Sequence, residues 1–453
     1  MESSQLNIGF GGNRVTTTEK FIAKTGRKNG QSNRLAPQDR AFHDWYRFVL
    51  SYPPHLVQDY LDKFKLAPNS VVLDPFCGTG TTLVEAKLSG MKAIGIEANT
   101  FPYFATSVKV DWSIDPENLL ATAFEIESKT NDILKSQGID DLLGLNSDHQ
   151  DFVLKKLNPE AAALLLKDSI SPLPLHKTLV LLDCLAEYKN TRFFRYMQLA
   201  LANALVFKIS NLHFGPEVGV KNPKDDSPVI SAWSDEIKKI TADLKSIAGK
   251  QYPTAEVFLA DARNLQTFAP QSVDAVITSP PYPNEKDYTR TTRLESVVLG
   301  FINNKAELRG LKKTLVRSNT RGVYKNDNDD QWISENLEIQ RLADEIENRR
   351  IQLGKDSGFE RMYSRVTRLY FGGMAKHLAE MRRILKPGAQ LAYVVGDQAS
   401  YLRVKIQTGK LLSDIARVLG YELIGIDLFR TRLSTVTREQ LREEVVVLRW
   451  PGK

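Results

Sequence analysis

The sequence predicts an α/β protein in which a β-sheet of seven strands is interrupted by two long insertions. Two observations support this fold class. Short apolar runs recur between helix-compatible segments, and one pair of runs brackets a helix of the length that a parallel β-α-β crossover needs. The strand candidates are residues 71–73, 93–96, 257–260, 275–278, 390–395, 421–428 and 445–448.

The other elements follow in order along the chain. Residues 1–40 are rich in Gly, Ser, Asn, Gln and Lys and lack periodicity, so we expect a flexible N-terminal arm there. Residues 56–64 have helical spacing before the first strand, and 82–89 are helix-compatible between the first two strands. A further helix is predicted at 374–385, immediately before the fifth strand.

Two interruptions divide the strands into three groups. Residues 113–255 read mainly as helix, including 179–185 and 193–209, whereas residues 284–365 form a polar stretch. We therefore expect one core built from residues 41–112, 256–283 and 366–453, with a helical insertion and a basic insertion. Residues 284–326 contain ten Lys or Arg against four Asp or Glu, and ten minus four gives a surplus of +6.

Composition excludes several classes of protein. Hydrophobic residues make up 42% and charged residues 25% of the 453, which is typical of a soluble globular chain with a sizeable core. Two cysteines, Cys77 and Cys184, provide neither a disulfide framework nor a zinc cluster, so we expect a reducing cytoplasm and no metal. No apolar run approaches the roughly 20 residues of a membrane span, and no signal peptide is recognisable. A net charge of +7 favours an anionic partner.

A glycine-rich turn at Asp74–Thr82 follows the first strand and opens a helix. Glycines at such a turn permit close approach of the backbone to a ligand. A structural bend or a phosphate loop would have a similar sequence, but the lysine of a phosphate loop is missing. Glu97 ends the second strand about 20 residues later, where a carboxylate accepts hydrogen bonds from ribose hydroxyls. The pattern predicts a cofactor that carries adenosine.

The tetrapeptide Ser279-Pro280-Pro281-Tyr282 ends the fourth strand. Paired prolines fix the direction of the flanking hydroxyl, carbonyl and ring. Such a turn can hold an exocyclic amino group between the Ser279 hydroxyl and the Pro280 carbonyl while the Tyr282 ring stacks on the base. Taken alone, the tetrapeptide would best fit an ordinary proline turn with a packed tyrosine.

Together, Asp74–Thr82 and Ser279–Tyr282 resemble the cofactor and catalytic motifs of the amino-DNA methyltransferases. The resemblance implies a Rossmann-like, mostly parallel, seven-stranded methyltransferase sheet whose first and fourth strands are neighbours. It also implies S-adenosyl-L-methionine as cofactor and double-stranded DNA with a flipped target base as partner. In this chain the cofactor motif precedes the catalytic motif, unlike the commonest order among Ser-Pro-Pro-Tyr members.

The resemblance extends to single residues. Tyr52 and Pro53 belong to a segment that is similar to the one touching the methionine part of the cofactor, and Asp261 is similar to the family's adenine-contacting acid, with a helix cap as the alternative. The implied cofactor-binding residues are Tyr52, Pro53, Asp74, Pro75, Phe76, Gly78, Gly80, Thr81, Thr82, Glu97 and Asp261. The implied catalytic residues are Ser279, Pro280, Pro281 and Tyr282.

Serine at the first position of the catalytic motif is similar to the cytosine-N4 group, whereas Asp or Asn is usual in adenine-N6 enzymes. We therefore expect methylation of cytosine N4 in DNA, with adenine N6 as the alternative, within a restriction-modification or defence system that includes a cognate restriction endonuclease. The basic stretch 284–326 would neutralise DNA phosphates, or else form a solvated surface.

Three further readings have less support from the residues. An RNA guanine-N2 methyltransferase would share the glycine loop, but its catalytic turn usually begins with Asp. Cytosine-C5 chemistry needs a cysteine nucleophile, and neither Cys77 in the cofactor loop nor Cys184 in a predicted helix is placed for attack. An inactive DNA-binding subunit would have no use for both halves of an active site.

Overall fold

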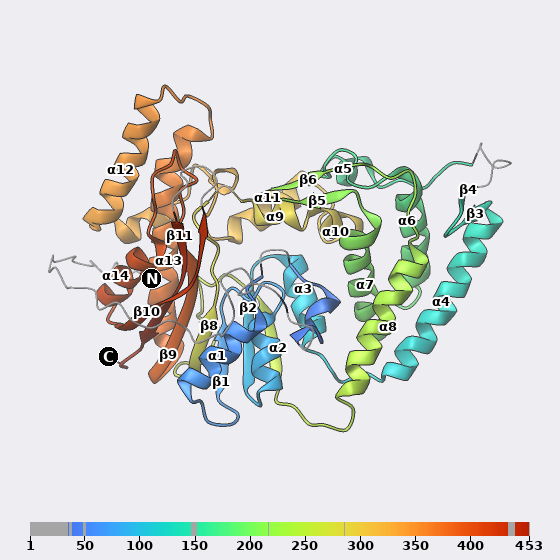
Figure 1. Ribbon diagram of the computed structural model, residues 1–453, viewed down its shortest axis with the longest axis horizontal. Helices are drawn as coiled ribbons and strands as arrows, with labels where there is room; N and C mark the ends of the chain where they lie inside the picture. Colours follow the sequence, from blue (N-terminus) through green and yellow to red (C-terminus); the bar gives the residue numbers. More distant parts are fainter. Residues whose placement is uncertain are drawn as a thin grey trace.

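The computed structural model describes residues 35, 39–48, 51–145, 152–215, 217–284, 286–433 and 440–452. Most of the expected N-terminal arm therefore lies outside the described residues. The centre of the molecule is a seven-stranded sheet in the order β10-β11-β9-β8-β1-β2-β7 (Figure 1). Its strands are β1 (Val71–Asp74), β2 (Lys92–Glu97), β7 (Ala255–Leu259), β8 (Val273–Thr278), β9 (Leu385–Gly396), β10 (Glu422–Leu433) and β11 (Gln440–Arg449).

The pairing of these strands confirms the predicted mostly parallel, Rossmann-like sheet. Strands β7, β2, β1, β8 and β9 pair in parallel, and only β11 runs antiparallel, between β9 and β10. From β1 the chain continues to β2 and β7 on one side and later returns to β8 on the other. The strand order therefore reverses between β1 and β8, which is where open α/β sheets bind their ligands.

Each face of the sheet is covered by its own helices, because alternate residues of a buried strand point to opposite faces. Ala392, Val394 and Val447 belong to the core on one face, which includes α1 (Pro54–Phe64), α2 (Thr81–Leu88) and α3 (Thr100–Lys109). Leu391 and Val446, their neighbours in sequence, belong to the core on the other face, with α13 (Tyr363–Ile384) and α14 (Thr408–Val418).

The 113–255 segment forms a helical bundle beside the β2–β7 side of the sheet (Figure 1). Two small hairpins accompany the bundle. The elements are α4 (Pro116–Ser136), β3 (Ile139–Asp140), β4 (Gly144–Leu145), α5 (Pro159–Ala162), α6 (Pro172–Ala186), α7 (Phe193–Ala204) with a π-helical extension (Leu205–Ile209), β5 (Leu212–Phe214), β6 (Val218–Val220) and α8 (Ile230–Ser246).

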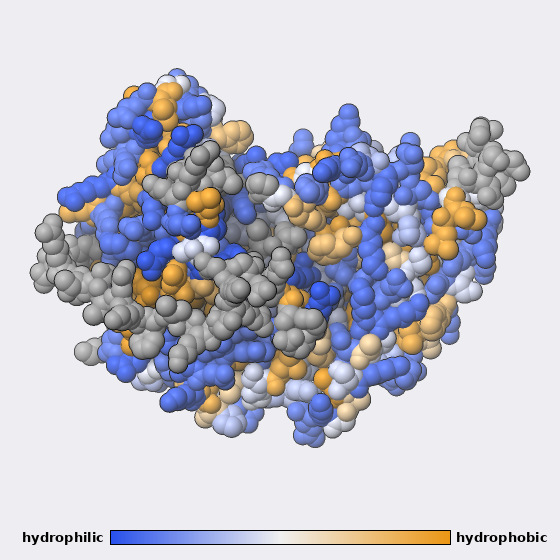
Figure 2. All heavy atoms as spheres, viewed as in Figure 1, coloured by the Kyte–Doolittle hydropathy of each residue, from blue (hydrophilic) through white to orange (hydrophobic). Residues whose placement is uncertain are grey.

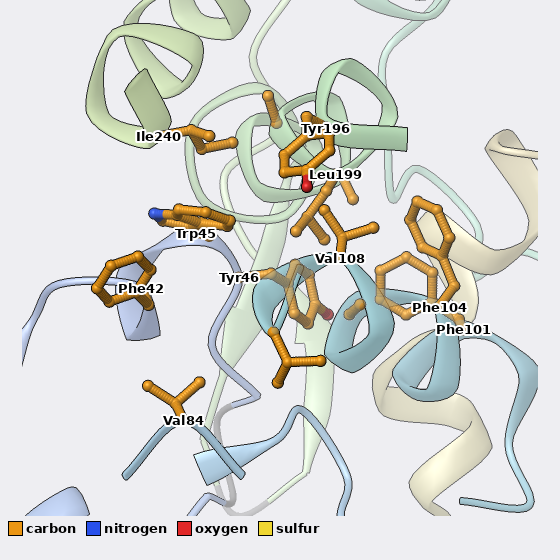
Figure 3. Close-up of a cluster of buried hydrophobic side chains, with 14 of the residues drawn as sticks. Phe42, Trp45, Tyr46, Val84, Phe101, Phe104, Val108, Tyr196, Leu199 and Ile240 are labelled. Atoms are coloured by element: carbon orange, nitrogen blue, oxygen red, sulfur yellow. The ribbon is translucent and has the colours of Figure 1, made fainter. Parts of the chain in front are cut away.

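The bundle shares a continuous hydrophobic core with the sheet domain (Figure 3). Trp45 and Tyr46, which precede α1, lie between α3 and the bundle. Tyr196 of α7 contacts the Trp45 ring edge-on, with centroids 6.1 Å apart, and Tyr46 meets Phe101 of α3 at 4.9 Å. Burial of these large aromatic surfaces fixes the bundle against the sheet.

The 284–365 segment, which the sequence describes only as polar, is largely helical. It contains α9 (Tyr288–Thr291), α10 (Arg293–Val298), α11 (Lys305–Thr314) and α12 (Leu337–Gln352), followed by α13, which begins at Tyr363 rather than at the predicted residue 374. No residue of α11 is buried, and α12 buries only Ile339, Ala343 and Ile346. These helices therefore lack the broad apolar stripe from which a helix is recognised in a sequence.

On the face shown in Figure 2, hydrophilic residues cover most of the described surface, with hydrophobic residues in patches between them. A search of the described residues for a helix with the length and apolar character of a membrane span finds none.

Candidate active site

The two motifs singled out in the sequence meet at one edge of the sheet. Strands β1 and β8 are parallel neighbours, with Val72 opposite Ala275 and Leu73 opposite Val276. Their carboxyl ends therefore lie side by side, and the turn after β1 faces the turn after β8 across a cavity of about 690 Å³. A volume of this size is in the range of small-molecule and cofactor sites.

Most of the predicted site residues line this cavity. They are Tyr52, Pro75, Phe76, Gly78, Thr81, Glu97, Asp261, Ser279, Pro280, Pro281 and Tyr282. Pro53, Asp74, Gly80 and Thr82 are not part of its wall. Asp74 and Thr82 have no exposed surface, so the structure places them behind the wall rather than in it.

The glycine loop is shaped by two residues with left-handed backbone. Gly78 has φ +50° and Gly80 has φ +83°, a region that side chains other than glycine rarely adopt. A Cβ on Gly80 would come within 2.7 Å of Thr106 Cγ2, whereas a Cβ on Gly78 would meet no atom within 4 Å. The Thr106 hydroxyl donates to the Gly78 carbonyl at 2.7 Å, which ties the loop to α3. Gly80 thus permits packing, while the space beside Gly78 is open to a ligand.

The Glu97 carboxylate joins the end of β2 to the glycine loop. One oxygen accepts a hydrogen bond from the Gly78 amide at 2.9 Å, and the other accepts from the Asn99 amide at 2.8 Å. Burial raises the pKa of Glu97 to about 7, although these amide donors oppose the shift. Each carboxylate oxygen has a second lone pair, so a group with two hydroxyls in the cavity can still be bound.

The buried Asp74 carboxylate connects the glycine loop to Ser279–Tyr282, which we call the catalytic turn after its predicted role. It accepts hydrogen bonds from the Tyr52 hydroxyl at 2.9 Å, the Thr278 hydroxyl at 2.6 Å and the Phe76 amide at 3.1 Å. Thr82 of α2, which also contacts the Tyr52 hydroxyl, donates to the carbonyl of Ile277 at 3.0 Å. Thr278 immediately precedes Ser279, so these contacts fix the start of the catalytic turn relative to the glycine loop.

The catalytic turn is held by backbone contacts on both sides. The Ser279 hydroxyl donates to the carbonyl of Val394 in β9 at 3.2 Å. The Tyr282 amide donates to the Tyr288 hydroxyl at 3.3 Å. When the Ser279 hydroxyl donates to Val394, its oxygen can accept hydrogen bonds, and the Tyr282 side chain is one neighbouring partner.

Asp261 lies at the mouth of the cavity but is also part of a turn. Its carboxylate forms an ion pair with the Arg263 guanidinium at 2.7 Å and accepts a hydrogen bond from the Arg263 amide at 2.9 Å. The same guanidinium is 2.6 Å from Asp329 in the 284–365 segment. Residues 261–272 form turns rather than a helix, so Asp261 does not cap a helix. Its side chain is 28% exposed, which leaves room for a ligand.

Comparison with known proteins supports the resemblance that the motifs indicate. A family model described as DNA methylase, of the N6 and N4 type, matches residues 19–104. The Type II methyltransferase M.BsoBI of Geobacillus stearothermophilus is 25% identical over 91% of this chain and 85% of its own length. The Type II methyltransferase M.AvaI of Nostoc sp. is 24% identical over 93% of this chain and 88% of its own length.

These matches support the resemblance of the chain to the amino-DNA methyltransferases. The resemblance implies S-adenosyl-L-methionine as cofactor. A second family model, described as an RMKL-like methyltransferase domain, matches residues 63–167 and ends before the catalytic turn. A solved structure, TrmN from Thermus thermophilus, aligns over 91% of this chain and 53% of its own with 13% identity and a TM-score of 0.30.

The cavity wall also contains two groups of residues that the sequence motifs do not reveal. One group, from the 284–365 segment, includes Lys286, Tyr288, Lys312 and Arg317. The other comes from the β10–β11 hairpin and consists of Phe429, Arg430, Arg432, Leu433, Leu441 and Glu443. Two charged residues spaced by two within a strand, such as Arg430 and Arg432, are a sequence signal for one polar face, but only the topology shows where that face lies.

Part of the basic charge in residues 284–326 is used within the segment. Lys312 is 2.7 Å from Asp287, and Arg317 is 2.8 Å from Asp327. Asp327 lies outside residues 284–326, so its pair with Arg317 makes the surplus available to DNA phosphates smaller than the +6 counted there.

Proposed function

We propose that the protein transfers a methyl group from S-adenosyl-L-methionine to the exocyclic N4 amino group of cytosine in DNA, as the modification enzyme of a restriction-modification or defence system. The observation that carries this proposal is the orientation of the Ser279 hydroxyl. The hydroxyl lines the cavity and lies 3.2 Å from the Val394 carbonyl, and when it donates there its oxygen can accept a hydrogen bond from a ligand. The match to a family model described as DNA methylase supports DNA as the substrate, and the relatives M.BsoBI and M.AvaI are named Type II methyltransferases.

The catalytic turn would hold the amino group by its two hydrogens. In our proposal Ser279 Oγ accepts one hydrogen, the Pro280 carbonyl accepts the other, and the Tyr282 ring stacks on the flipped base. Hydrogen bonds of this geometry draw the nitrogen lone pair out of conjugation with the ring, which makes it a better nucleophile. Pro281 keeps the turn rigid, so little reorientation is needed before reaction.

The opposite end of the cavity fits an adenosine-bearing cofactor. Glu97 would accept hydrogen bonds from the ribose hydroxyls, the open space beside Gly78 would admit the chain that bears the sulfonium, and Asp261 would accept from the adenine amino group. When bound, S-adenosyl-L-methionine supplies an electrophilic methyl group. Asp74 and Thr82 would act from behind the wall by setting the position of the glycine loop relative to the catalytic turn.

The test is mass spectrometry of nucleosides from DNA incubated with the protein and isotope-labelled S-adenosyl-L-methionine. We expect labelled N4-methylcytosine. Labelled N6-methyladenine would keep the family and overturn the base assignment, and label in RNA alone would overturn DNA as the substrate.

The role of Ser279 is tested by the variant Ser279→Ala. Loss of one preorganised hydrogen bond at the reacting nitrogen should lower turnover by about 100-fold while leaving cofactor affinity unchanged. The matched control is Ser246→Ala, an exposed serine at the end of α8, which should keep full turnover. Full turnover in Ser279→Ala would exclude the assigned role.

A further inference from the structure

A row of three residues crosses the sheet beside the catalytic turn. Gly396 in β9 is the register partner of Glu443 in β11, and Glu443 is the register partner of Arg430 in β10. Residues that pair across neighbouring strands project to the same face of the sheet. Arg432, two residues beyond Arg430 on β10, projects to that face as well.

This row lies directly beside Tyr282. A Cβ placed on Gly396 would be 3.0 Å from Tyr282 Cε2 and 3.2 Å from Glu443 Cγ. The aromatic ring and the glutamate therefore pack over the same glycine. Arg430, Arg432 and Glu443 line the same cavity as Ser279 and Tyr282, so any base held by the catalytic turn has this row as its neighbour.

The charges in this part of the wall do not balance. The Glu443 carboxylate is 2.5 Å from Arg430 Nε and 3.8 Å from Arg432 Nε. Lys286, four residues after Tyr282, lines the cavity on the same side, and the nearby Arg432 contributes, after burial, to lowering the pKa of Lys286. Glu217 of the cavity wall also acts on Lys286, so two carboxylates face the three cations, and Glu217 is shared with Arg290 at 3.7 Å.

The two arginines are held in place before any ligand arrives. Arg432 Nη2 donates to the Asp397 carbonyl at 2.9 Å and to Gln398 Oε1 at 3.2 Å. Glu443 holds Arg430 through the ion pair described above. A guanidinium that is already oriented loses less conformational freedom when it binds an anion, and its planar fork matches a phosphate.

We propose that Lys286, Arg430 and Arg432 form a binding site for the DNA phosphate adjacent to the flipped nucleotide. The inference rests on the proposed function, because it takes the base to be held by Ser279–Tyr282. A nucleotide drawn into the cavity brings its flanking phosphodiester to the wall beside the base, where the surplus of positive charge lies. Contact with that phosphate holds the nucleotide out of the duplex, and it carries no information about sequence.

The experiment combines a protein change with a change in the DNA. The substrate is a duplex that contains the unmodified target base, identified in the mass-spectrometry experiment. It is prepared in natural form or with one neutral methylphosphonate in place of either phosphate flanking that base. Each duplex is tested with the unaltered protein, with Arg432→Gln and with Lys286→Gln, and the KM for DNA is measured at saturating cofactor.

We expect one of the two methylphosphonates to raise the KM of the unaltered protein by about tenfold, which is typical for loss of one charged contact. Arg432→Gln and Lys286→Gln should each raise the KM for the natural duplex by a similar factor, with cofactor affinity unchanged. The same methylphosphonate should then raise the KM of either variant by less than twofold, because the contact is already lost.

The matched control is Lys92→Gln, an exposed lysine at the start of β2 and therefore at the opposite edge of the sheet from the cavity. It should retain the full tenfold response to the neutral linkage. Full tenfold responses in both cavity variants, with melting temperatures that show folded protein, would overturn the phosphate site. If the label is found on adenine instead of cytosine, the base assignment fails, yet the same cycle on a duplex centred on that adenine still tests the phosphate site.

Discussion

The 113–255 and 284–365 segments are both inserted into the order of the strands, yet they relate to the cavity in opposite ways. Among the described residues of 113–255, only Glu217 reaches the cavity wall. The shorter 284–365 segment supplies a large part of that wall, from Asn284 to Gly322. The helical bundle instead buries its apolar side chains in the core that it shares with α3.

The difference shows that length and helical content do not indicate which insertion serves the site. What matters is the strand after which the segment leaves the sheet. The 284–365 segment follows β8 directly and so begins at the catalytic turn, whereas the bundle begins after α3, away from the carboxyl end of β1. We therefore propose that the 284–365 segment meets DNA and that the 113–255 segment braces the core.

The sharpest test exchanges one buried cation in each segment. Arg317→Met removes a side chain that is 2.8 Å from both Asp327 oxygens and from the Lys312 carbonyl. Leaving Asp327 without its cation should cost about 3–5 kcal/mol locally and distort the cavity wall. We expect kcat/KM for DNA methylation to fall by about 100-fold.

Lys177→Met is the matched change in the bundle. Lys177 is fully buried and lies 2.8 Å from Asp226 and 2.9 Å from the Asp141 carbonyl. The melting temperature should fall, while kcat/KM per folded molecule, measured well below that temperature, should stay within about threefold. A large loss of activity in folded Lys177→Met would break the contrast between the two segments.

A second test addresses the hydrogen bond between Thr278 and Asp74, which belongs to the sheet and to neither inserted segment. Thr278→Val keeps the shape of the side chain but removes the 2.6 Å hydrogen bond to Asp74. A buried acceptor that loses its partner costs about 1–3 kcal/mol, so turnover should fall by roughly 10- to 100-fold. Thr278→Ser retains the hydroxyl and should restore most of the turnover. Equal turnover in the Val and Ser variants would show that the contact does not position the catalytic turn.

A smaller effect concerns the cofactor end of the cavity, where burial raises the pKa of Glu97 to about 7. Since ribose hydroxyls donate to the ionised carboxylate, cofactor affinity should weaken by up to about tenfold for each pH unit below 7. Without cofactor, the pH dependence of the stability of the folded protein has the opposite direction. The folded-state pKa exceeds the unfolded value, so the contribution of Glu97 to stability is present at low pH and is lost as the pH rises through 7.

Isothermal titration with S-adenosyl-L-methionine between pH 6 and 8 measures this dependence, and Glu97→Gln is the control. The variant should bind more weakly, without the pH dependence. An affinity of the unaltered protein that does not change with pH would exclude Glu97 as the ribose acceptor.

The smallest effect is expected at the hairpin between β3 and β4 in the bundle. Leu143 there is 87% exposed, which would suit a side chain that inserts into DNA. If the 113–255 segment only braces the core, as we propose, the hairpin does not contact DNA. Leu143→Ser should then change the KM for DNA by less than about twofold. A clear rise in KM would place the bundle on the DNA and remove the distinction between the segments.

The sequence predicts the sheet better than the cavity. All seven strands of the sheet appear where apolar runs predict them. The central strands β1 and β8 are buried almost throughout, so few polar residues interrupt their apolar runs. The meeting of Asp74–Thr82 with Ser279–Tyr282 follows from the order of the strands. The helices α11 and α12 could not be recognised, because they bury too few residues to produce an apolar period.

Two features of the site needed the structure itself. The motif includes Asp74 without showing whether its carboxylate faces a ligand, and only the contacts with Tyr52 and Thr278 reveal that it lies behind the wall. Arg430 and Glu443 become neighbours of Tyr282 only through the register of β9, β11 and β10. Sequence spacing contains no information about pairing between strands that are not yet ordered in a sheet.

The position of β11 also determines when this site can form. β11 follows β10 in the chain but is inserted between β9 and β10, so the sheet cannot be completed in the order of synthesis. Until residues 440–449 have left the ribosome, β9 has an unpaired edge and Arg430 has no Glu443 beside it. A nascent chain could therefore assemble the glycine loop and the catalytic turn first, and acquire the proposed phosphate contact in its last folding step.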